Sequence, residues 1–263
     1  MDALDLNRAH WDALAAVHGQ DAYYDKDALV SGRDSLNEFE AAAVGDVTGL
    51  DVLHLQCHIG FDSISLARRG ARVTGVDFSP ASLAAAAELA ERAGVQVDWV
   101  EAEATALPEA LHGRFDIVYS TVGVIGWNAD IDAWMRSVAG ALRPGGRLVL
   151  VELHPIFLMV ASTDPLVLDF PYAFDGPRVF DEDGSYADPA AHIDATKTVE
   201  YAHSLGEVVT AAIGAGLRID ALHEHMDATR DGRGMLPREE DGRCRLRVGG
   251  EILPLFYTLQ AIR

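Results

Sequence analysis

A glycine-poor loop between an apolar run and a helical segment is the first candidate for chemistry. The run from Val52 to Asp62 reads VLHLQCHIGFD. Of the three glycine positions in a G-x-G-x-G loop, only Gly60 carries glycine, and the other two carry Gln56 and His58. A dinucleotide pyrophosphate needs close approach to the backbone at successive glycines and a helix N-terminus for its charge. Because Gln56 and His58 would obstruct that approach, the loop argues against a dinucleotide.

Acidic residues follow at the ends of two later apolar runs. Asp77 ends the second run, where a carboxylate can accept hydrogen bonds from both hydroxyls of a ribose and would repel a 2′-phosphate, so NADP is disfavoured. Glu103 follows the third run, where it could accept a hydrogen bond from an adenine amine. A helix N-terminal region with two acids suits a cation that carries adenosine and no phosphate.

Two histidines could move a proton. A neutral imidazole at His154, after the run that ends at Glu152, could take a proton from a hydroxyl, an amine or an acidic carbon. The alternative for His154 is a hydrogen bond to a loop carbonyl before Pro155. His203 is the second candidate, one helical turn before Glu207, whose spacing also suits a capping box.

The histidines and cysteines do not have the spacing of a metal site. His54 and Cys57 are expected on opposite faces of an alternating strand, and no neighbouring pair supplies a chelate spacing. His223 and His225 share a face, but such a pair is more typical of a strand end. We therefore expect no metal.

The composition excludes several classes of protein. Hydrophobic residues make up 49% of the 263 residues and charged residues 24%, which is ordinary for a globular protein and excludes a fibrous or disordered one. The formal charge of 21 − 41 = −20 repels nucleic acid and anionic lipid. The two cysteines are too few for a disulfide framework, and neither a leader sequence nor a membrane-spanning run is evident. We expect a cytoplasmic monomer or homodimer without a nucleic-acid or membrane partner.

Short apolar runs alternate with amphipathic segments, which is the pattern of a parallel sheet covered by helices. The expected strands cover residues 51–56, 71–77, 95–101, 115–120, 146–152, 217–223 and 253–262. The sequence therefore predicts an α/β fold with a doubly wound, mostly parallel seven-stranded sheet.

Helix signals support this order. Ser79 can cap a helix that has Pro80 in its first turn and Gly94 after its end. A second helix is expected over residues 131–142, with a turn at 143–146.

Two segments lie outside the alternating pattern. Residues 1–45 predict an N-terminal helical cap with a break near Gly32, and residues 155–200 predict a lid insertion with short strands. We expect the whole chain, residues 1–263, to form one domain.

The chain resembles class I S-adenosylmethionine-dependent methyltransferases, most closely a subgroup whose first motif reads like HLQCHIG, here residues 54–60. Other similar segments are VTGVDFS at 73–79, LRPGG at 142–146, YAD at 186–188 and HSLGE at 203–207. The resemblance runs from about Asn7 to the C-terminus. It implies the Rossmann-like fold of that family and S-adenosylmethionine as cofactor.

The resemblance also implies a set of contacts with that cofactor. They are Gln56, His58 and Gly60 for the methionine portion, Asp77 for the ribose, Phe78, Glu103 and Ala104 for the adenine, Ser120 for the sulfonium end, and Ser79 beside them. Most relatives place an acid on the first strand for the cofactor amine. Here His54 takes that position, so another residue or a water molecule must make the contact.

Aromatic residues would complete the pocket. In similar methyltransferases the N-terminal segment folds over the cofactor, so Trp11, Tyr23 or Tyr24 could cover the sulfonium; we expect Tyr24 to contact it. The alternative is ordinary helix packing. The candidates for substrate contacts are Trp127, Glu152 and Tyr201.

The leading hypothesis is a methyltransferase that acts on O, N or C of a small metabolite. The protein would mainly align and desolvate the reactants, with one general base, His154 or His203. The alternatives are an enzyme that uses the same cofactor for elimination or rearrangement, an NAD-dependent oxidoreductase, and a noncatalytic binding module.

Overall fold

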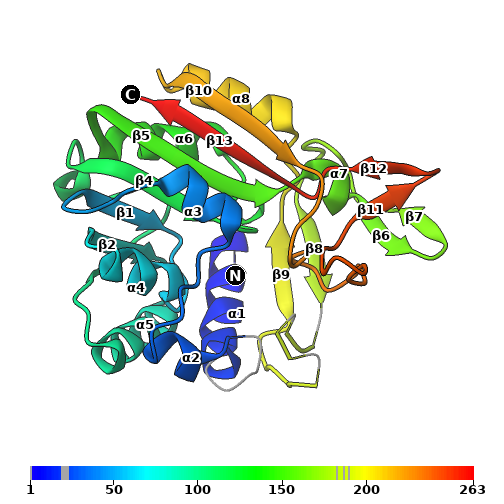
Figure 1. The fold of residues 1–263 in the computed structure, drawn as a ribbon, viewed down its shortest axis with the longest axis horizontal. Coiled ribbons are helices and arrows are strands. Elements are labelled where there is room, and N and C mark those ends of the chain that lie inside the picture. The colour runs from blue at the N-terminus through cyan, green and yellow to red at the C-terminus, as the bar shows by residue number, and fades with distance from the viewer. Residues whose placement is uncertain (1, 19–23, 182, 186, 189) are drawn as a thin grey trace.

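A computed structural model describes residues 2–18, 24–181, 183–185, 187–188 and 190–263 (Figure 1). Its centre is one sheet with the strand order β10-β13-β5-β4-β1-β2-β3. The seven strands are β1 (Asp51–Leu55), β2 (Arg72–Asp77), β3 (Asp98–Glu101), β4 (Phe115–Thr121), β5 (Leu142–Leu153), β10 (Arg218–His225) and β13 (Phe256–Ile262).

The pairing of these strands confirms the expected doubly wound sheet. β1 pairs in parallel with β2 and β4, β2 with β3, and β4 with β5. β13 runs antiparallel to both β5 and β10. The strand order reverses between β1 and β4, and in such sheets the crevice beyond the carboxyl ends at this point is where ligands bind.

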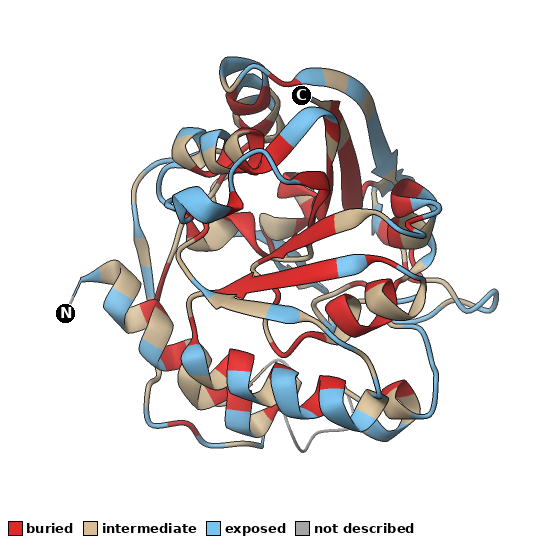
Figure 2. Ribbon diagram, turned by 90° about the vertical axis from the view of Figure 1, so that its left-hand side faces the viewer, coloured by how far each residue is buried: buried red, intermediate tan, exposed pale blue. Residues whose placement is uncertain are grey.

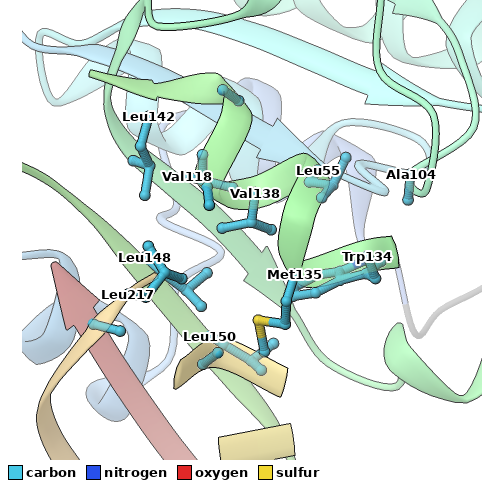
Figure 3. Packing of buried hydrophobic residues seen from close by; sticks show 14 of the residues in the cluster. Leu55, Ala104, Val118, Trp134, Met135, Val138, Leu142, Leu148, Leu150 and Leu217 are labelled. Atoms are coloured by element: carbon cyan, nitrogen blue, oxygen red, sulfur yellow. The ribbon is translucent and has the colours of Figure 1, made fainter. Parts of the chain in front are cut away.

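Helices cover both faces of the sheet and turn their buried sides toward it (Figure 2). The helices are α1 (Ala3–Val17), α2 (Lys26–Val30), α3 (Glu38–Val44), α4 (Phe61–Arg68), α5 (Pro80–Ala93), α6 (Ile131–Ala141), α7 (Pro155–Leu158) and α8 (Leu205–Gly214), with 3-10 turns η1 (Glu109–Leu111) and η2 (Ile125–Trp127). On one face, Trp134 and Met135 of α6 pack against Leu148 and Leu150 of β5 (Figure 3). Each such buried side chain contributes roughly 1.5 to 3 kcal/mol.

Three expected strand boundaries were wrong. The third strand, expected from Val95, begins at Asp98, and the other two have a distant partner and a proline as their causes. Residues 143–146, expected as a turn, lie within β5, where Gly145 donates a hydrogen bond to the Arg263 carbonyl at 3.0 Å. The last strand, expected from Leu253, begins at Phe256, since Pro254 has no N–H for the ladder. Leu253 instead ends β12 (Glu251–Leu253), which pairs with β11 (Leu246–Val248).

The segment after β5 forms two hairpins. β6 (Val160–Thr163) pairs with β7 (Leu166–Leu168), and β8 (Arg178–Asp181) pairs with β9 (Lys197–Glu200). Figure 1 shows β9 beside α1, and the β6–β7 and β11–β12 hairpins projecting at the same side of the molecule.

Helix α1 is fastened to this segment by side-chain hydrogen bonds to the backbone. The Asn7 amide donates to the Val199 carbonyl and accepts from the Val199 N–H, both at 2.8 Å. The His10 ring lies 2.8 Å from the Ala195 carbonyl. These bonds join the first helix to the segment that ends at β9.

Helix α5 begins as its sequence predicts. The Ser79 hydroxyl accepts a hydrogen bond from the Ser82 N–H at 3.0 Å, Pro80 takes the first helical position, and Gly94 ends the helix in a left-handed conformation. The same hydroxyl donates to Asp12 at 2.6 Å, which ties α1 to α5.

Replacing Ser79 with alanine should lower the free energy of unfolding by about 1 kcal/mol, because the helix loses its N-cap. Urea denaturation followed by circular dichroism measures the change. Ser79→Thr keeps the hydroxyl and should recover most of the loss. An alanine variant as stable as the parent would contradict the capping role.

Candidate functional site

A cavity of about 860 Å³ opens at the carboxyl ends of β1, β2, β4 and β5. Its walls come from the strand-end loops, from residues 33–40, from the insertion and from residues 228–233. This volume lies toward the upper end of the range for ligand pockets, about 300 to 1,000 Å³.

The loop after β1 has the backbone of a glycine loop although most of its residues are not glycine. The φ angles of Gln56, His58 and Gly60 are 58°, 49° and 77°. A left-handed conformation costs a residue with a side chain roughly 1 to 2 kcal/mol. Such strain persists where the surroundings enforce it and is concentrated at functional sites. Gln56 and His58 thus reproduce the path that glycine would take.

Side-chain hydrogen bonds hold Gln56 in this conformation. Its amide donates to the Val124 carbonyl at 2.9 Å, and its Oε1 accepts from the Trp134 indole at 2.8 Å. The side chain therefore joins the β1 loop to the loop after β4 and to α6.

Gly60 is required for two structural reasons. A Cβ there would lie 2.6 Å from the Trp99 ring and 2.8 Å from Ala86, and its φ is in the left-handed region. Both neighbours pack behind the loop, so the absence of a side chain brings the start of α4 close to α5 and β3. Gly60 also lines the cavity.

Asp77 is the buried acid at the end of β2. Its carboxylate accepts hydrogen bonds from the backbone N–H of His58 at 2.8 Å and of Ser79 at 2.9 Å. Burial raises the pKa of Asp77 to about 6, and these N–H groups oppose the rise. Each oxygen keeps one lone pair for a ligand hydroxyl.

A second cavity of about 30 Å³ adjoins the first and shares Gln56, Phe78 and Trp127 with it. Glu103 and Ala104 line this smaller space. Phe78 offers an aromatic face, and Glu103 also forms a 3.9 Å ion pair with Arg8. The structure therefore brings the expected adenine contacts together beside the end of β2.

Aromatic side chains cover the β1 loop. Ring centroids of Trp11 and Tyr24 lie 5.1 and 5.6 Å from that of His58. His18 Nδ1 lies 3.1 Å from His58 Nε2, and its other nitrogen lies 2.7 Å from the Ser185 hydroxyl. Burial lowers the pKa of His18 to about 4 and that of His58 well below its usual value, so both rings are neutral at pH 7. Tyr23 lies outside the described residues.

Glu152 lines the cavity but has its oxygens engaged by the backbone. They accept hydrogen bonds from the backbone N–H groups of Val124 at 2.8 Å, Ile125 at 3.2 Å and Leu153 at 2.7 Å. The N–H of Gly123 is a fourth donor. Burial raises its pKa, and these donors oppose the rise. Glu152 therefore fixes the loop after β4, which carries Trp127 into the cavity wall.

His203 has one ring nitrogen without a hydrogen-bond partner among the described residues. Its Nε2 lies 2.7 Å from the Asn128 carbonyl, which can only accept, so Nε2 carries the hydrogen. Nδ1 then has a lone pair, is buried and is unpartnered. His203 and Tyr201 both line the cavity, with Phe174 stacked near each ring.

Three expected site residues do not line either cavity. The His154 ring accepts from the Ile156 N–H at 3.1 Å and lies 2.9 Å from Glu224 of β10, so both nitrogens have partners. The Ser120 hydroxyl donates to the Leu55 carbonyl inside the sheet at 2.9 Å, and strand alternation presents Thr121 instead. Ser79 is the α5 cap.

Other residues of the cavity wall were not anticipated. Glu40 and Asp62 supply two carboxylates, and Arg178 and Arg233 supply positive charge from the insertion side. Asp62 stands two residues after Gly60, so its place near the first loop could have been found from spacing alone. Glu40 and the arginines reach the cavity only through tertiary packing.

Part of this chain is similar to known methyltransferases. Residues 52–146 match a family model described as a methyltransferase domain. A ubiquinone biosynthesis O-methyltransferase of Azorhizobium caulinodans is 32% identical over 115 residues, 44% of this chain and 45% of that one. A demethylmenaquinone methyltransferase of Thermus thermophilus is 42% identical over 86 residues, 33% of this chain and 38% of that one. The matches span less than half the length of these relatives.

Solved structures share the fold over nearly the whole chain. An S-adenosylmethionine-dependent methyltransferase from Mesorhizobium loti superposes with a TM-score of 0.62 at 23% identity, covering 89% of this chain and 100% of that one. Magnesium protoporphyrin IX methyltransferase from Synechocystis, with bound SAH, gives 0.52 at 15% identity, covering 96% and 99%. The fold is therefore the Rossmann-like class I methyltransferase fold expected from the sequence.

The left-handed φ of Gln56 predicts that glycine at this position gives a more stable protein than alanine does. Gln56→Gly and Gln56→Ala both lose the side-chain hydrogen bonds, but glycine avoids the backbone strain and should be more stable by about 1 kcal/mol. Chemical denaturation measures both variants. Ala87→Gly on the exposed side of α5 is the control and should destabilise by about 1 kcal/mol. If Gln56→Ala proves as stable as Gln56→Gly, the loop has relaxed out of its left-handed conformation and the prediction is wrong.

Proposed function

We propose that this chain, with its methyltransferase domain at residues 52–146, is an S-adenosylmethionine-dependent methyltransferase that acts on a small molecule. The observation that carries this proposal is the left-handed loop at 56–60 beside the buried carboxylate of Asp77, in a large cavity at the strand-order reversal. The motif HLQCHIG further suggests membership of the subgroup with that first motif.

The residues present fit the cofactor. Asp77 has free lone pairs for two ribose hydroxyls, Phe78 offers a face to the adenine, and Glu103 lies at the edge of the adjoining cavity. The bulk of Gln56 and His58 disfavours a pyrophosphate. When bound, S-adenosylmethionine supplies a methyl group already activated by a sulfonium.

His203 is our candidate for the general base. Its Nε2–H is fixed by the Asn128 carbonyl, which leaves the Nδ1 lone pair to take the proton of an acceptor hydroxyl as the new O–CH₃ bond forms. The chain's other contribution is to align the reactants and exclude water, through the aromatic cover over His58 and the walls at Trp127 and Tyr201.

An oxygen acceptor is favoured within this proposal. Several relatives are named for O-methylation in ubiquinone biosynthesis. The cavity wall away from Asp77 carries Phe170, Tyr172 and Phe180, which suit an apolar or aromatic acceptor. We therefore propose a small hydroxylated aromatic molecule.

The covering segments complete the proposed enzyme. We propose that residues 1–263 act as one domain, in which the cap at 1–45 and the lid at 155–200 enclose the reactants. In the part of the chain that the structure describes, no helix has both the length and the apolarity needed to cross a membrane.

Calorimetric titration with S-adenosylmethionine, S-adenosylhomocysteine and NAD tests the cofactor. We expect binding of both adenosyl ligands and none of NAD. The ionised form of Asp77 accepts the ribose hydroxyls, and its pKa is about 6 before binding. Affinity for S-adenosylhomocysteine should therefore rise about tenfold from pH 5 to pH 7.

Asp77→Asn should weaken this binding by roughly 1 to 3 kcal/mol at pH 7 and flatten its pH dependence. Asp98→Asn, at an exposed position of β3, is the matched control and should leave both unchanged. A steep pH profile that persists in Asp77→Asn would remove Asp77 from the ribose site.

His203→Gln should lower the methylation rate about 10²-fold or more and leave S-adenosylhomocysteine affinity unaltered, because glutamine cannot take the proton. The assay follows transfer of a labelled methyl group to a panel of phenols and catechols. His112→Gln at an exposed site is the control. An unchanged rate in the His203 variant would leave that ring a purely structural role.

A further inference from the structure

We infer that Glu40 and Asp62 together bind the α-ammonium group of the amino-acid half of S-adenosylmethionine. This inference rests on the proposed function and names the residues that take over a role for which the first strand offers only His54. The two carboxylates reach the cavity from α3 and from the start of α4.

Three hydrogen bonds hold the Asp62 carboxylate in place and leave one of its acceptor sites free. One oxygen accepts from the Ser35 hydroxyl at 2.6 Å, and the other from the hydroxyls of Tyr119 at 3.1 Å and Thr121 at 3.0 Å. A carboxylate has about four lone-pair sites. Three neutral donors therefore orient the group and leave its charge uncompensated.

Glu40 is 95% buried and has one oxygen without a partner. Its Oε2 accepts from the Asn37 N–H at 2.7 Å in the capping box of α3, whereas Oε1 accepts no hydrogen bond among the described residues. Burial and the charge of Asp62 raise its pKa well above the usual value. A buried carboxylate in a cavity wall, next to a second one, calls for a cation.

Within the described residues, no protein cation pairs with this couple. The neighbouring acids Asp34 and Glu38 have arginine partners, Arg69 at 2.5 Å and Arg243 at 2.9 Å. Glu40 and Asp62 form no such ion pair with any residue that the structure describes.

The imidazole of His54 does not supply the missing charge. His54 has its Nδ1 2.8 Å from the Ser63 hydroxyl, and burial lowers its pKa to about 4, so the ring is neutral at pH 7. An ammonium group brings one positive charge and three N–H donors, which match the free oxygen of Glu40 and the remaining site on Asp62.

The test compares two ligands that differ by the amino-acid half. S-adenosylhomocysteine carries the ammonium group, and 5′-methylthioadenosine shares its adenosine and sulfur but lacks the amino acid. Calorimetry gives both dissociation constants for the parent, Glu40→Gln and Asp62→Asn. Gln at the third helix position keeps the capping box, so α3 should remain folded. Glu91→Gln, on the exposed side of α5, is the control.

We expect Glu40→Gln and Asp62→Asn each to weaken S-adenosylhomocysteine binding about tenfold or more, with 5′-methylthioadenosine affected less than about twofold. Equal losses for both ligands, or none, would overturn the inference while the cofactor assignment stands. If the parent binds neither ligand, the proposed function itself fails.

Discussion

The left-handed path of the chain from Gln56 to Gly60 is the constraint on which the site depends. It turns the backbone sharply at the end of β1, so that the His58 N–H donates to Asp77 and α4 can begin. Where glycine would follow this path freely, the side chains of Gln56 and His58 are held by Val124, Trp134 and a group of aromatic rings. The strain at the loop is thus balanced by contacts from three separate elements.

Charge is distributed unevenly around the cavity. Asp77 at the end of β2, Glu152 at the end of β5 and Glu40 of α3 accept hydrogen bonds from backbone N–H groups and pair with no described lysine or arginine. Asp34 and Glu38 also line the cavity, but arginines pair with both. Arg178 and Arg233 lie toward the insertion. The carboxylates on the sheet side favour a cationic ligand there. The arginines on the insertion side favour a methyl acceptor that loses a proton.

Local signals in the sequence predicted the order of strands and the helix caps. Ser79 and the pair Ser204 and Glu207 form their caps from residues three positions apart, so nearby residues suffice. The errors arose where distant partners decide. His154 is drawn to Glu224 of a strand 70 residues away, and Glu40 reaches the cavity only after α3 packs against the sheet. The residues that the resemblance assigns to the cofactor line the two cavities, except Ser79 and Ser120; their contacts with a cofactor stay a prediction.

The pairing of Asn7 with Val199 spans 192 residues of sequence. During synthesis, the first helix leaves the ribosome long before its partner strand exists. Until then, Asn7 and the aromatic side chain of Trp11 face solvent or transient neighbours. During this time the exposed surface of the helix can aggregate or bind a chaperone. The segment that closes over the cavity includes β9, so the nascent chain can enclose the cavity only after residues 197–200 have been made.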